Sequence, residues 1–370
     1  MKVLIVKLYG CGVNYQINYL SELIDKNFET TKDFKEADAI VMLGGCCCTE
    51  HDVYNTAKYI NYVLEQKRDD ATTYITGCIT KGFKDIPIYQ NLEREMHEIL
   101  DFVIKPADCN HLLDLLKQQA NLNFECETTI GYGISEFDKI QASIYLQTGC
   151  THNCSFCKSN YLNCELTDMP MEKVKRYIDE FDEQKVRYIQ LRGLNICQYG
   201  LGLYGRYRLM EICEYVEAKP NIRHLELGGF AFSDAIRMGF ADQLKYLTKT
   251  DLINGSLESG SDRLLHLMNK GFTMEAFWEF YHQINSQKKK DFYYSIISGF
   301  PTETLEDCAA TIEVFKKTKP KLVNINEYVD SPHVPSHNLE QLSDEEIAQH
   351  TKVYKKALRR NFTKYMDNLQ

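Results

Sequence analysis

Three cysteines lie close together in the stretch TGCTHNCSFCK, at Cys150, Cys154 and Cys157. Thiolates at this spacing in one tight loop can hold three irons of a 4Fe–4S cube and leave the fourth iron without a protein ligand. An open coordination position lets a cluster bind a substrate or cofactor directly, as open catalytic zinc sites do. A zinc site would need a fourth Cys or His at regular spacing, and His152 lies inside the loop, where it cannot easily complete a tetrahedron. The spacing therefore predicts an iron-sulfur cluster with one open iron.

A second set of cysteines follows three apolar runs near the N-terminus. Cys11 follows the first run, three consecutive cysteines beginning at Cys46 follow the second, and Cys78 follows the third. If these runs are parallel strands, their carboxyl ends converge on one crevice and the thiols can meet there. The alternative is that they are buried small hydrophobic residues, as free cysteines often are, but such residues would favour strand interiors over these glycine-flanked turns. The positions predict a second metal-binding group of three cysteines.

The composition places this chemistry in a globular protein of a reducing compartment. The chain has 370 residues with 44% hydrophobic and 26% charged residues, which excludes disordered and fibrous classes. Its net charge of −9 argues against bulk electrostatic coating of nucleic acid. It contains no apolar stretch of about 18 residues and no signal-peptide core, so we expect a cytoplasmic protein without a membrane segment. Its 14 cysteines should then be thiols or metal ligands rather than disulfides.

Two regions of alternating strands and helices must position the cysteine loops. In residues 1–122, short apolar runs alternate with segments of helical spacing, which predicts a small parallel α/β domain. Its expected strands are residues 2–7, 39–43, 73–76 and 102–104, and its expected helices are residues 15–26, 52–67 and 111–119. Residues 123–138 lose this periodicity and gain polar residues and glycine, so we place a linker there.

The alternation returns in residues 139–345, as six β/α units. The expected strands are residues 141–147, 186–191, 223–228, 252–257, 291–298 and 321–329, with helices at 171–181, 206–217, 234–247, 273–286 and 304–318. Six units favour an open, partial (β/α)6 TIM barrel, with functional groups at the carboxyl ends of its strands. Residues 346–370 form a C-terminal segment in which Lys352–Lys364 has helical spacing, six basic residues and no acidic residue.

The cysteine loop after the first barrel strand resembles that of the radical S-adenosylmethionine superfamily, and three further segments are similar to those of its methylthiotransferases. These segments are LRGLNICQYG at 191–200, LESGSDRLLHLMNKGFT at 257–273 and IISGFPTETLED at 296–307. They look like the L-x-G-Q-N-V-x-x-Y-G, Q-S-G-S-D-x-x-L-x-x-M-x-R-x-x-T and I-x-G-F-P-G-E-T-x-x-D stretches of that family. Each segment alone could be an ordinary strand-to-helix turn, but three in this order behind a three-cysteine loop are a strong signal.

The resemblance implies which residues contact S-adenosylmethionine. The loop cysteines would hold the radical 4Fe–4S cluster, and the aromatic side chain before the last of them would contact the adenine. Glycines at strand ends would let the backbone approach the cofactor closely, and polar side chains at strand ends could reach its ribose or carboxylate. The candidate cofactor-binding residues are Phe156, Gly193, Asn195, Glu258, Ser259, Gly299, Phe300 and Pro301.

The N-terminal cysteines resemble those that bind an auxiliary 4Fe–4S cluster in methylthiotransferases. Cys11 lies in a matching Y-G-C-x-x-N context and Cys78 in a matching G-C context. The middle ligand stays ambiguous, because the family has N-T-C where this chain has G-G-C-C-C. Alignment of Glu50 and the apolar residues after it favours Cys46, and Cys48 is the second choice.

The resemblance also implies an activity and its partners. One S-adenosylmethionine would methylate a sulfur carried by the auxiliary cluster, and another would be cleaved to a 5′-deoxyadenosyl radical that abstracts hydrogen from the substrate. The substrate radical would then take up the methylthio group. A reductant such as flavodoxin or ferredoxin would supply the electron, the substrate would be a macromolecule, and we expect the enzyme to be a monomer.

Several departures from the family bear on the substrate. Family members usually end in an additional TRAM β-barrel domain, for which only the basic C-terminal helix is available here. The family's arginines are missing from KSNYLNCELTDMP after Cys157 and from SPHVPSHN after the last strand. Leu194 and Glu258 stand where the family has Gln. Because tRNA binding calls for basic residues on phosphates, the sequence slightly favours a peptide or protein, such as a ribosomally made peptide, over tRNA.

Two other classes of function stay open from the sequence. One is a two-cluster radical enzyme that oxidises or cross-links its substrate without sulfur transfer. The other is a non-catalytic iron-sulfur sensor, which does not explain the cofactor motifs.

Overall fold

The structure is a computed structural model that describes residues 1–8, 14–45, 50–80, 87–104, 109–122, 133–137, 141–157, 166–331 and 334–367. The chain forms two compact units, Met1–Ser135 and Glu136–Gln370. Of the segment 123–138, expected as a linker, only residues 133–137 are described, and they form a strand. None of the described helices combines the length and apolar character needed to cross a bilayer.

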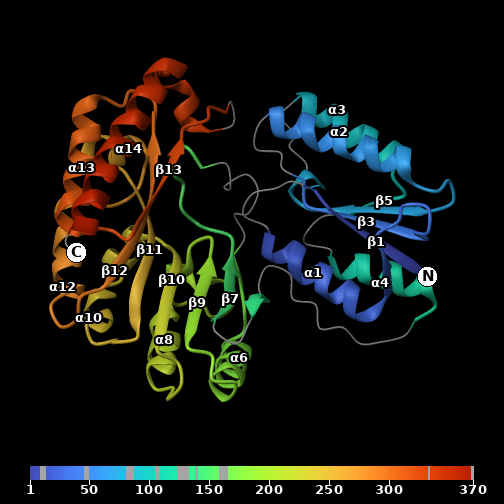
Figure 1. The fold of residues 1–370 in the computed structure, drawn as a ribbon, viewed down its shortest axis with the longest axis horizontal. Helices are drawn as coiled ribbons and strands as arrows, with labels where there is room; N and C mark the ends of the chain where they lie inside the picture. The colour runs from blue at the N-terminus through green and yellow to red at the C-terminus, as the bar shows by residue number, and fades with distance from the viewer. Residues whose placement is uncertain are drawn as a thin grey trace. The chain divides into compact units, whose positions relative to one another are not determined.

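The first unit is a five-stranded parallel sheet with helices on both faces (Figure 1). The strands lie in the order β2 (Glu29–Thr31), β1 (Lys2–Lys7), β3 (Ala39–Leu43), β4 (Thr72–Thr76) and β5 (Phe102–Ile104). Figure 1 shows α1 (Asn14–Asn27) and α4 (Cys109–Ala120) on one face, and α2 (Glu50–Gln66) and α3 (Pro87–Ile99) on the other. All five residues of β3 are buried, as expected for the central strand of a parallel sheet covered on both faces. The predicted α/β class is confirmed.

The second unit is an open partial barrel of six parallel strands that form a continuous ladder. These strands are β7 (Gln141–Thr148), β9 (Tyr188–Gly193), β10 (His224–Phe230), β11 (Thr250–Glu258), β12 (Asp291–Ser298) and β13 (Leu322–Glu327). At one edge β6 (Gly133–Phe137) lies beside β7, and β8 (Thr167–Asp168) pairs antiparallel with β7. The sheet path ends at β13 and β6 without closing on itself. The predicted (β/α)6 architecture is confirmed.

Helices cover the outer face of this barrel (Figure 1). They are α6 (Met171–Glu183), α7 (Leu201–Tyr204), α8 (Leu209–Glu217), α9 (Phe232–Arg237), α10 (Ala241–Leu244), α11 (Asp262–Leu267), α12 (Met274–Ile284), α13 (Leu305–Thr318) and α14 (Asp344–Asp367). Period-two alternation along the strands directs apolar side chains to the helices: in β12, Phe292, Tyr294 and Ile296 are buried. Phe232 and Phe277 make an edge-to-face contact in the same aromatic core, with ring centroids 5.1 Å apart.

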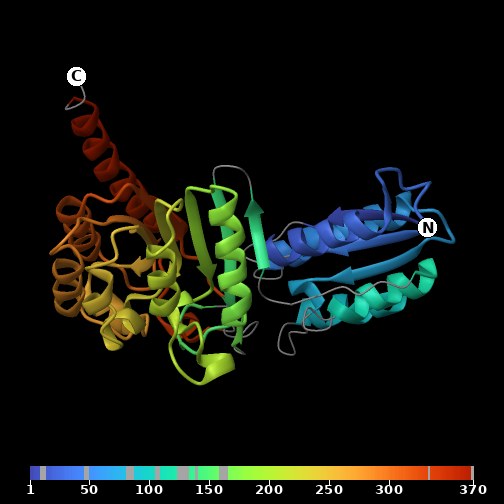
Figure 2. The ribbon, with the colours of Figure 1, turned by 90° about the horizontal axis from the view of Figure 1, so that it is seen from below.

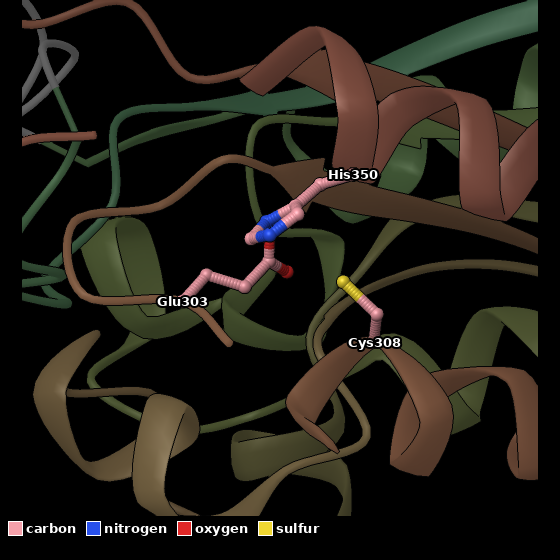
Figure 3. A group of neighbouring side chains, drawn as sticks. All are labelled: Glu303, Cys308 and His350. Atoms are coloured by element: carbon pink, nitrogen blue, oxygen red, sulfur yellow. The ribbon is translucent and has the colours of Figure 1, made fainter. Parts of the chain in front are cut away.

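Helix α14 covers the β13 edge of the barrel and is docked through a buried polar cluster. It packs on α13, β13 and β12, and Figure 2 shows its C-terminal end extending away from the barrel. In Figure 3, His350 of α14 lies over the carboxylate of Glu303, with Cys308 beside them. The Glu303 carboxylate accepts hydrogen bonds from the Gly299 backbone N (2.6 Å), His350 Nδ1 (2.9 Å) and the Tyr354 hydroxyl (2.8 Å). Glu303 therefore joins the turn after β12 to α14.

The Glu303 cluster also has the donor types of a metal site. Among the described residues, the ligand atoms of Glu303, Cys308 and His350 lie within 4.8 Å of one another. However, both carboxylate oxygens already accept hydrogen bonds with ordinary donor–acceptor geometry. We therefore interpret the cluster as the polar anchor of α14.

Candidate active site

The three loop cysteines begin two residues after β7, where the chain turns at Gly149 with φ +84°. Cys154 is buried, whereas Cys150 and Cys157 are partly exposed. Cys150 and Cys154 each lie near enough to Cys157 for its charge to affect their ionisation. Burial raises the pKa of Cys150 above its ordinary value and the pKa of Cys154 to about 11, although the Lys270 charge opposes the latter shift. Burial thus favours the protonated thiols of Cys150 and Cys154, and binding iron must release their protons.

The cysteine loop is fixed by hydrogen bonds to segments far along the chain. Ser155 donates from its backbone N to Met268 O (3.0 Å) and from its hydroxyl to Leu267 O (2.7 Å). The Asn269 amide donates to Asn153 O (2.8 Å). On the other side, the Gln198 side chain accepts from the Thr151 backbone N and donates to its hydroxyl. The loop is thus positioned by two of the three segments that resemble the methylthiotransferases.

Phe156 joins the loop to the carboxyl ends of β11 and β12. Its ring makes an edge contact with Phe300, with centroids 6.4 Å apart, and Phe300 packs in turn on Tyr328. The ammonium of Lys270 lies 6.0 Å from the Phe156 ring centroid. Phe300 and the following Pro301 are buried. The structure thus brings together the aromatic residues that the sequence predicted at this site.

Glu258 ends β11 with a left-handed backbone, at φ +65°, and its side chain is buried beside Lys270. The Lys270 Nζ lies 3.5 Å from Glu258 Oε1 and 3.3 Å from Ser256 Oγ. Burial raises the pKa of Glu258 above its ordinary value, and the charge and hydrogen bond of Lys270 oppose this shift. An ion pair therefore lies close to the cysteine loop, and Lys270 is a residue that the sequence reasoning did not single out.

Asn195 follows β9 and lies against the first loop cysteine. Only 2% of the residue is exposed, and its Nδ2 lies 3.8 Å from Cys150 Sγ and 2.7 Å from Asp234 Oδ2. Its Oδ1 is buried and has no hydrogen-bond partner among the described residues. An unsatisfied buried acceptor is costly, and a bound molecule with an N–H or O–H group would satisfy it. The polar surroundings of the loop therefore fit a cofactor in contact with the cluster.

The predicted glycines have local structural reasons. A Cβ at Gly193 would lie 2.8 Å from Ile196 Cγ2 and 3.0 Å from Gln147 O, so this glycine lets β9 lie against β7. Gly299 has φ +75°, and a Cβ there would lie 2.6 Å from Ile347 Cγ1 of α14. The close neighbour of Gly299 is therefore a residue of α14, whereas the sequence analysis expected the cofactor to approach this glycine.

The second and third resembling segments are hydrogen-bonded to each other. The Ser259 hydroxyl is buried 3.4 Å from that of Thr311, and the Ser261 hydroxyl donates to Asp307 (2.5 Å). Asp307 also completes a capping box with Thr304 at the start of α13. Ser259 thus lies against α13, and the structure gives its hydroxyl a buried neighbour there.

The sequence reasoning missed Asp234 and considered His152 only as a zinc ligand. His152 Nε2 lies 2.8 Å from Asp234 Oδ2, and the Asp234 side chain is fully buried in α9. Burial alone would raise the pKa of Asp234, but hydrogen bonds from His152 and Asn195 and nearby positive charge bring it below its ordinary value. No local pattern identifies Asp234, because its partners come from other β/α units; the one available signal was a histidine inside the cysteine loop.

The N-terminal cysteines are only partly covered by the structure. Cys11, Cys46, Cys47 and Cys48 lie outside the described residues, and Cys78 begins a short 3-10 helix after β4. The strands that precede the three positions, β1, β3 and β4, are adjacent and parallel. The chain after β3 touches the chain after β4, because the Gly44 N donates to Thr76 O (2.8 Å) and a Cβ at Gly77 would lie 2.0 Å from Gly44 O.

Comparison with known proteins agrees with this geometry. A family model described as the radical SAM superfamily matches residues 144–315. The chain is 23% identical over 366 residues to a tRNA-2-methylthio-N(6)-dimethylallyladenosine synthase from a Nitratiruptor species, covering 95% of this chain and 82% of the relative. It is 26% identical over 369 residues to the protein of that name from Ehrlichia canis (strain Jake), covering 94% and 81%.

Solved structures with the same fold also extend over both units. The radical S-adenosylmethionine methyltransferase TsrM from Kitasatospora setae matches with a TM-score of 0.60 at 14% identity, over 91% of this chain and 77% of that chain. The cobalamin-dependent radical enzyme OxsB matches with a TM-score of 0.55 at 12% identity, over 96% and 56%. At these identities the likeness concerns the fold.

The cysteine loop, the partial barrel and the matched family model define a radical S-adenosylmethionine enzyme. Within that superfamily, the chain is related to the methylthiotransferases along nearly its whole length, including the N-terminal unit.

Proposed function

We propose that this protein transfers a methylthio group to an unactivated carbon of a macromolecular substrate. The observation that carries the proposal is the arrangement of the N-terminal unit. Three neighbouring parallel strands, β1, β3 and β4, each lead into a cysteine-bearing segment, and the relatives that share this unit are named as methylthio-forming synthases. A two-cluster radical enzyme without sulfur transfer would share these thiols, so the methylthio-forming names of the relatives favour transfer over that alternative.

Two 4Fe–4S clusters and S-adenosylmethionine are the proposed cofactors. Cys150, Cys154 and Cys157 would hold the radical cluster, and Cys11, Cys46 and Cys78 the auxiliary cluster. When bound, these groups supply radical chemistry and the sulfur to be transferred. A one-electron reductant such as flavodoxin or ferredoxin is the proposed redox partner.

The chain's own residues position and shield the site. The cysteine loop is held by backbone and side-chain bonds at Ser155, Asn153 and Thr151, which fixes its geometry before any cofactor binds. Phe156 and Phe300 place aromatic surface beside the loop, where it would shield the site from solvent and from other hydrogen donors. Asn195 supplies a buried acceptor for the cofactor.

Transfer RNA is the first candidate substrate. The relatives that match 94–95% of the chain carry a tRNA-modifying name, and this shifts the balance from the peptide that the sequence slightly favoured. A peptide or protein is the second candidate, because the chain has a net charge of −9 and lacks the family's arginines after Cys157. This matters because contacts of basic side chains with phosphates usually supply much of a protein's affinity for nucleic acid.

An anaerobic assay of the reconstituted full-length protein tests the proposal. The enzyme, S-adenosylmethionine and dithionite are incubated with tRNA bearing N(6)-dimethylallyladenosine, with candidate peptides, or with neither. We expect 5′-deoxyadenosine and S-adenosylhomocysteine together, and a mass gain of one methylthio group on the tRNA. The same gain on a peptide would select the second candidate.

The variant Cys150→Ala should abolish 5′-deoxyadenosine, whereas Cys213→Ala is the matched control because Cys213 is a buried thiol in α8. Formation of 5′-deoxyadenosine without S-adenosylhomocysteine, with oxidised or cross-linked product, would reject methylthio transfer. Absence of both small molecules in every arm would favour a non-catalytic iron-sulfur protein.

A further inference from the structure

A buried carboxylate behind the cysteine loop gathers hydrogen bonds from two segments that contact Cys150. Asp234 is fully buried at the start of α9, and its Oδ2 accepts from His152 Nε2 (2.8 Å) and from Asn195 Nδ2 (2.7 Å). His152 belongs to the loop, whereas Asn195 belongs to the turn after β9. One carboxylate oxygen therefore fixes the relative position of these two segments.

The two residues that donate to Asp234 also donate to Cys150: His152 through a different atom, its backbone N, and Asn195 through the same Nδ2. The His152 backbone N lies 3.4 Å from Cys150 Sγ, and Asn195 Nδ2 lies 3.8 Å from it. Because Asn195 Nδ2 is held by Asp234, its amide cannot rotate freely, and its Oδ1 is left as the unpartnered acceptor among the described residues. The orientation of the amide at the first loop cysteine thus depends on a residue in another β/α unit.

The other carboxylate oxygen of Asp234, Oδ1, contacts residues that can serve as a control. Its Oδ1 pairs with the guanidinium of Arg237, which is 62% exposed, and lies 3.5 Å from the Tyr207 hydroxyl. Neither Arg237 nor Tyr207 has a described contact with the cysteine loop. Substitutions on this side should change the surroundings of the carboxylate without moving the groups at Cys150.

We infer that Asp234 is a positioning residue for the cluster at Cys150: it holds His152 and Asn195 so that their N–H groups face the cysteine sulfur, and it places a negative charge behind them. The inference rests on a 4Fe–4S cluster at this loop and does not depend on methylthio transfer. Hydrogen bonds to cluster sulfurs and nearby charge set reduction potential, and residues that orient metal ligands typically affect affinity or activity 10–100-fold, by order of magnitude.

The test is a comparison of Asp234→Asn, Asp234→Ala and Tyr207→Phe in the reconstituted full-length protein. Iron content, the midpoint potential of the radical cluster, its EPR spectrum with and without S-adenosylmethionine, and the affinity for S-adenosylmethionine are measured. To isolate the radical cluster, all variants are also made in a background with the three N-terminal ligand cysteines replaced by alanine.

We expect Asp234→Asn to retain iron and to make the potential less negative, because the reduced cluster no longer faces a buried negative charge. Asp234→Ala should also weaken S-adenosylmethionine binding by about 10-fold, since Asn195 loses its orienting partner. Tyr207→Phe should match the parent protein in all four measurements.

If both Asp234 variants match Tyr207→Phe, or if Asp234→Asn simply loses its iron, the inference is overturned. Should neither Asp234 variant fold, His152→Gln tests the same contact from the loop side. A changed midpoint potential or an altered EPR spectrum in the presence of S-adenosylmethionine supports the inference, and unchanged values overturn it. These measurements can be interpreted even if the earlier assay shows no methylthio transfer, because they concern only the cluster at Cys150.

Discussion

Glu258 and Lys270 occupy positions where the resembling family segment has Gln and Arg, and in this chain they form a buried pair. We predict that Glu258→Gln lowers the free energy of unfolding by about 2 kcal/mol, because the buried ammonium loses its carboxylate and keeps only neutral acceptors. Replacing Lys270 by Met as well should recover part of this loss, since no buried charge then remains unpaired. Anaerobic urea unfolding measures both changes.

The exposed pair Glu313–Lys316 provides the control for this prediction. Glu313→Gln should leave the unfolding midpoint unchanged, because both side chains are more than half exposed. If Glu258→Gln unfolds at the same urea concentration as Glu313→Gln, the buried pair does not contribute in the way proposed.

At the residue scale, the sequence identified side chains whose spacing is local. Cys150, Cys154 and Cys157 could be assigned because three ligands in one loop form a pattern by themselves. Asp234 could not, because its partners His152 and Asn195 belong to different β/α units and only the fold brings them together. The role of a glycine is also ambiguous in the sequence. The presence of Gly299 does not tell whether α14 or a cofactor lies close to it.

At the scale of elements, the docking of α14 depends on the buried carboxylate of Glu303. We predict that His350→Ala lowers the free energy of unfolding by about 1–3 kcal/mol, because the carboxylate loses one of its three donors. It should also raise hydrogen exchange in the peptide covering the first half of α14, measured by mass spectrometry.

His337→Ala is the matched control for α14, because His337 pairs with Asp330 at 2.7 Å but both side chains are exposed. It should leave exchange in α14 unchanged. Equal exchange in the two variants would contradict the anchoring role of His350.

The elements themselves were predicted well where burial is simple. The strands at residues 2–7, 39–43 and 102–104 were predicted with the bounds that the structure has, because continuous apolar runs mark buried parallel strands. The strand Glu29–Thr31 was missed because its short polar sequence lacks that signal. The helix expected at 234–247 is divided into α9 and α10 at Gly239, whose φ of +64° breaks the helix.

At the scale of the whole molecule, the two units are expected to hold one cluster each. We predict about eight iron atoms per reconstituted chain, and about four when either set of three ligand cysteines is replaced by alanine. Only replacement of Cys150, Cys154 and Cys157 should remove the change that S-adenosylmethionine causes in the EPR spectrum.

Single alanine variants of Cys46, Cys47 and Cys48 identify the middle auxiliary ligand in the same assay. We expect iron to fall with Cys46→Ala. A loss confined to Cys47→Ala would contradict the assignment, and a loss confined to Cys48→Ala would select the second choice.

The order of strands could be predicted only as far as the α/β class. Alternating strands and helices determine parallel pairing, but the adjacency of β1, β3 and β4 depends on which crossovers the chain takes. The substrate is even harder to predict from the sequence, because side chains in loops select it and the pattern that builds the barrel does not.

The contact between Gly44 and Gly77 has a consequence for how this protein can vary. A side chain at Gly77 would collide with the Gly44 carbonyl, so neither loop can change at that point without the other. Substitution at this contact is therefore restricted. Three consecutive cysteines stand just beyond it, so a lineage could exchange one sulfur donor for its neighbour while the supporting backbone stays constant.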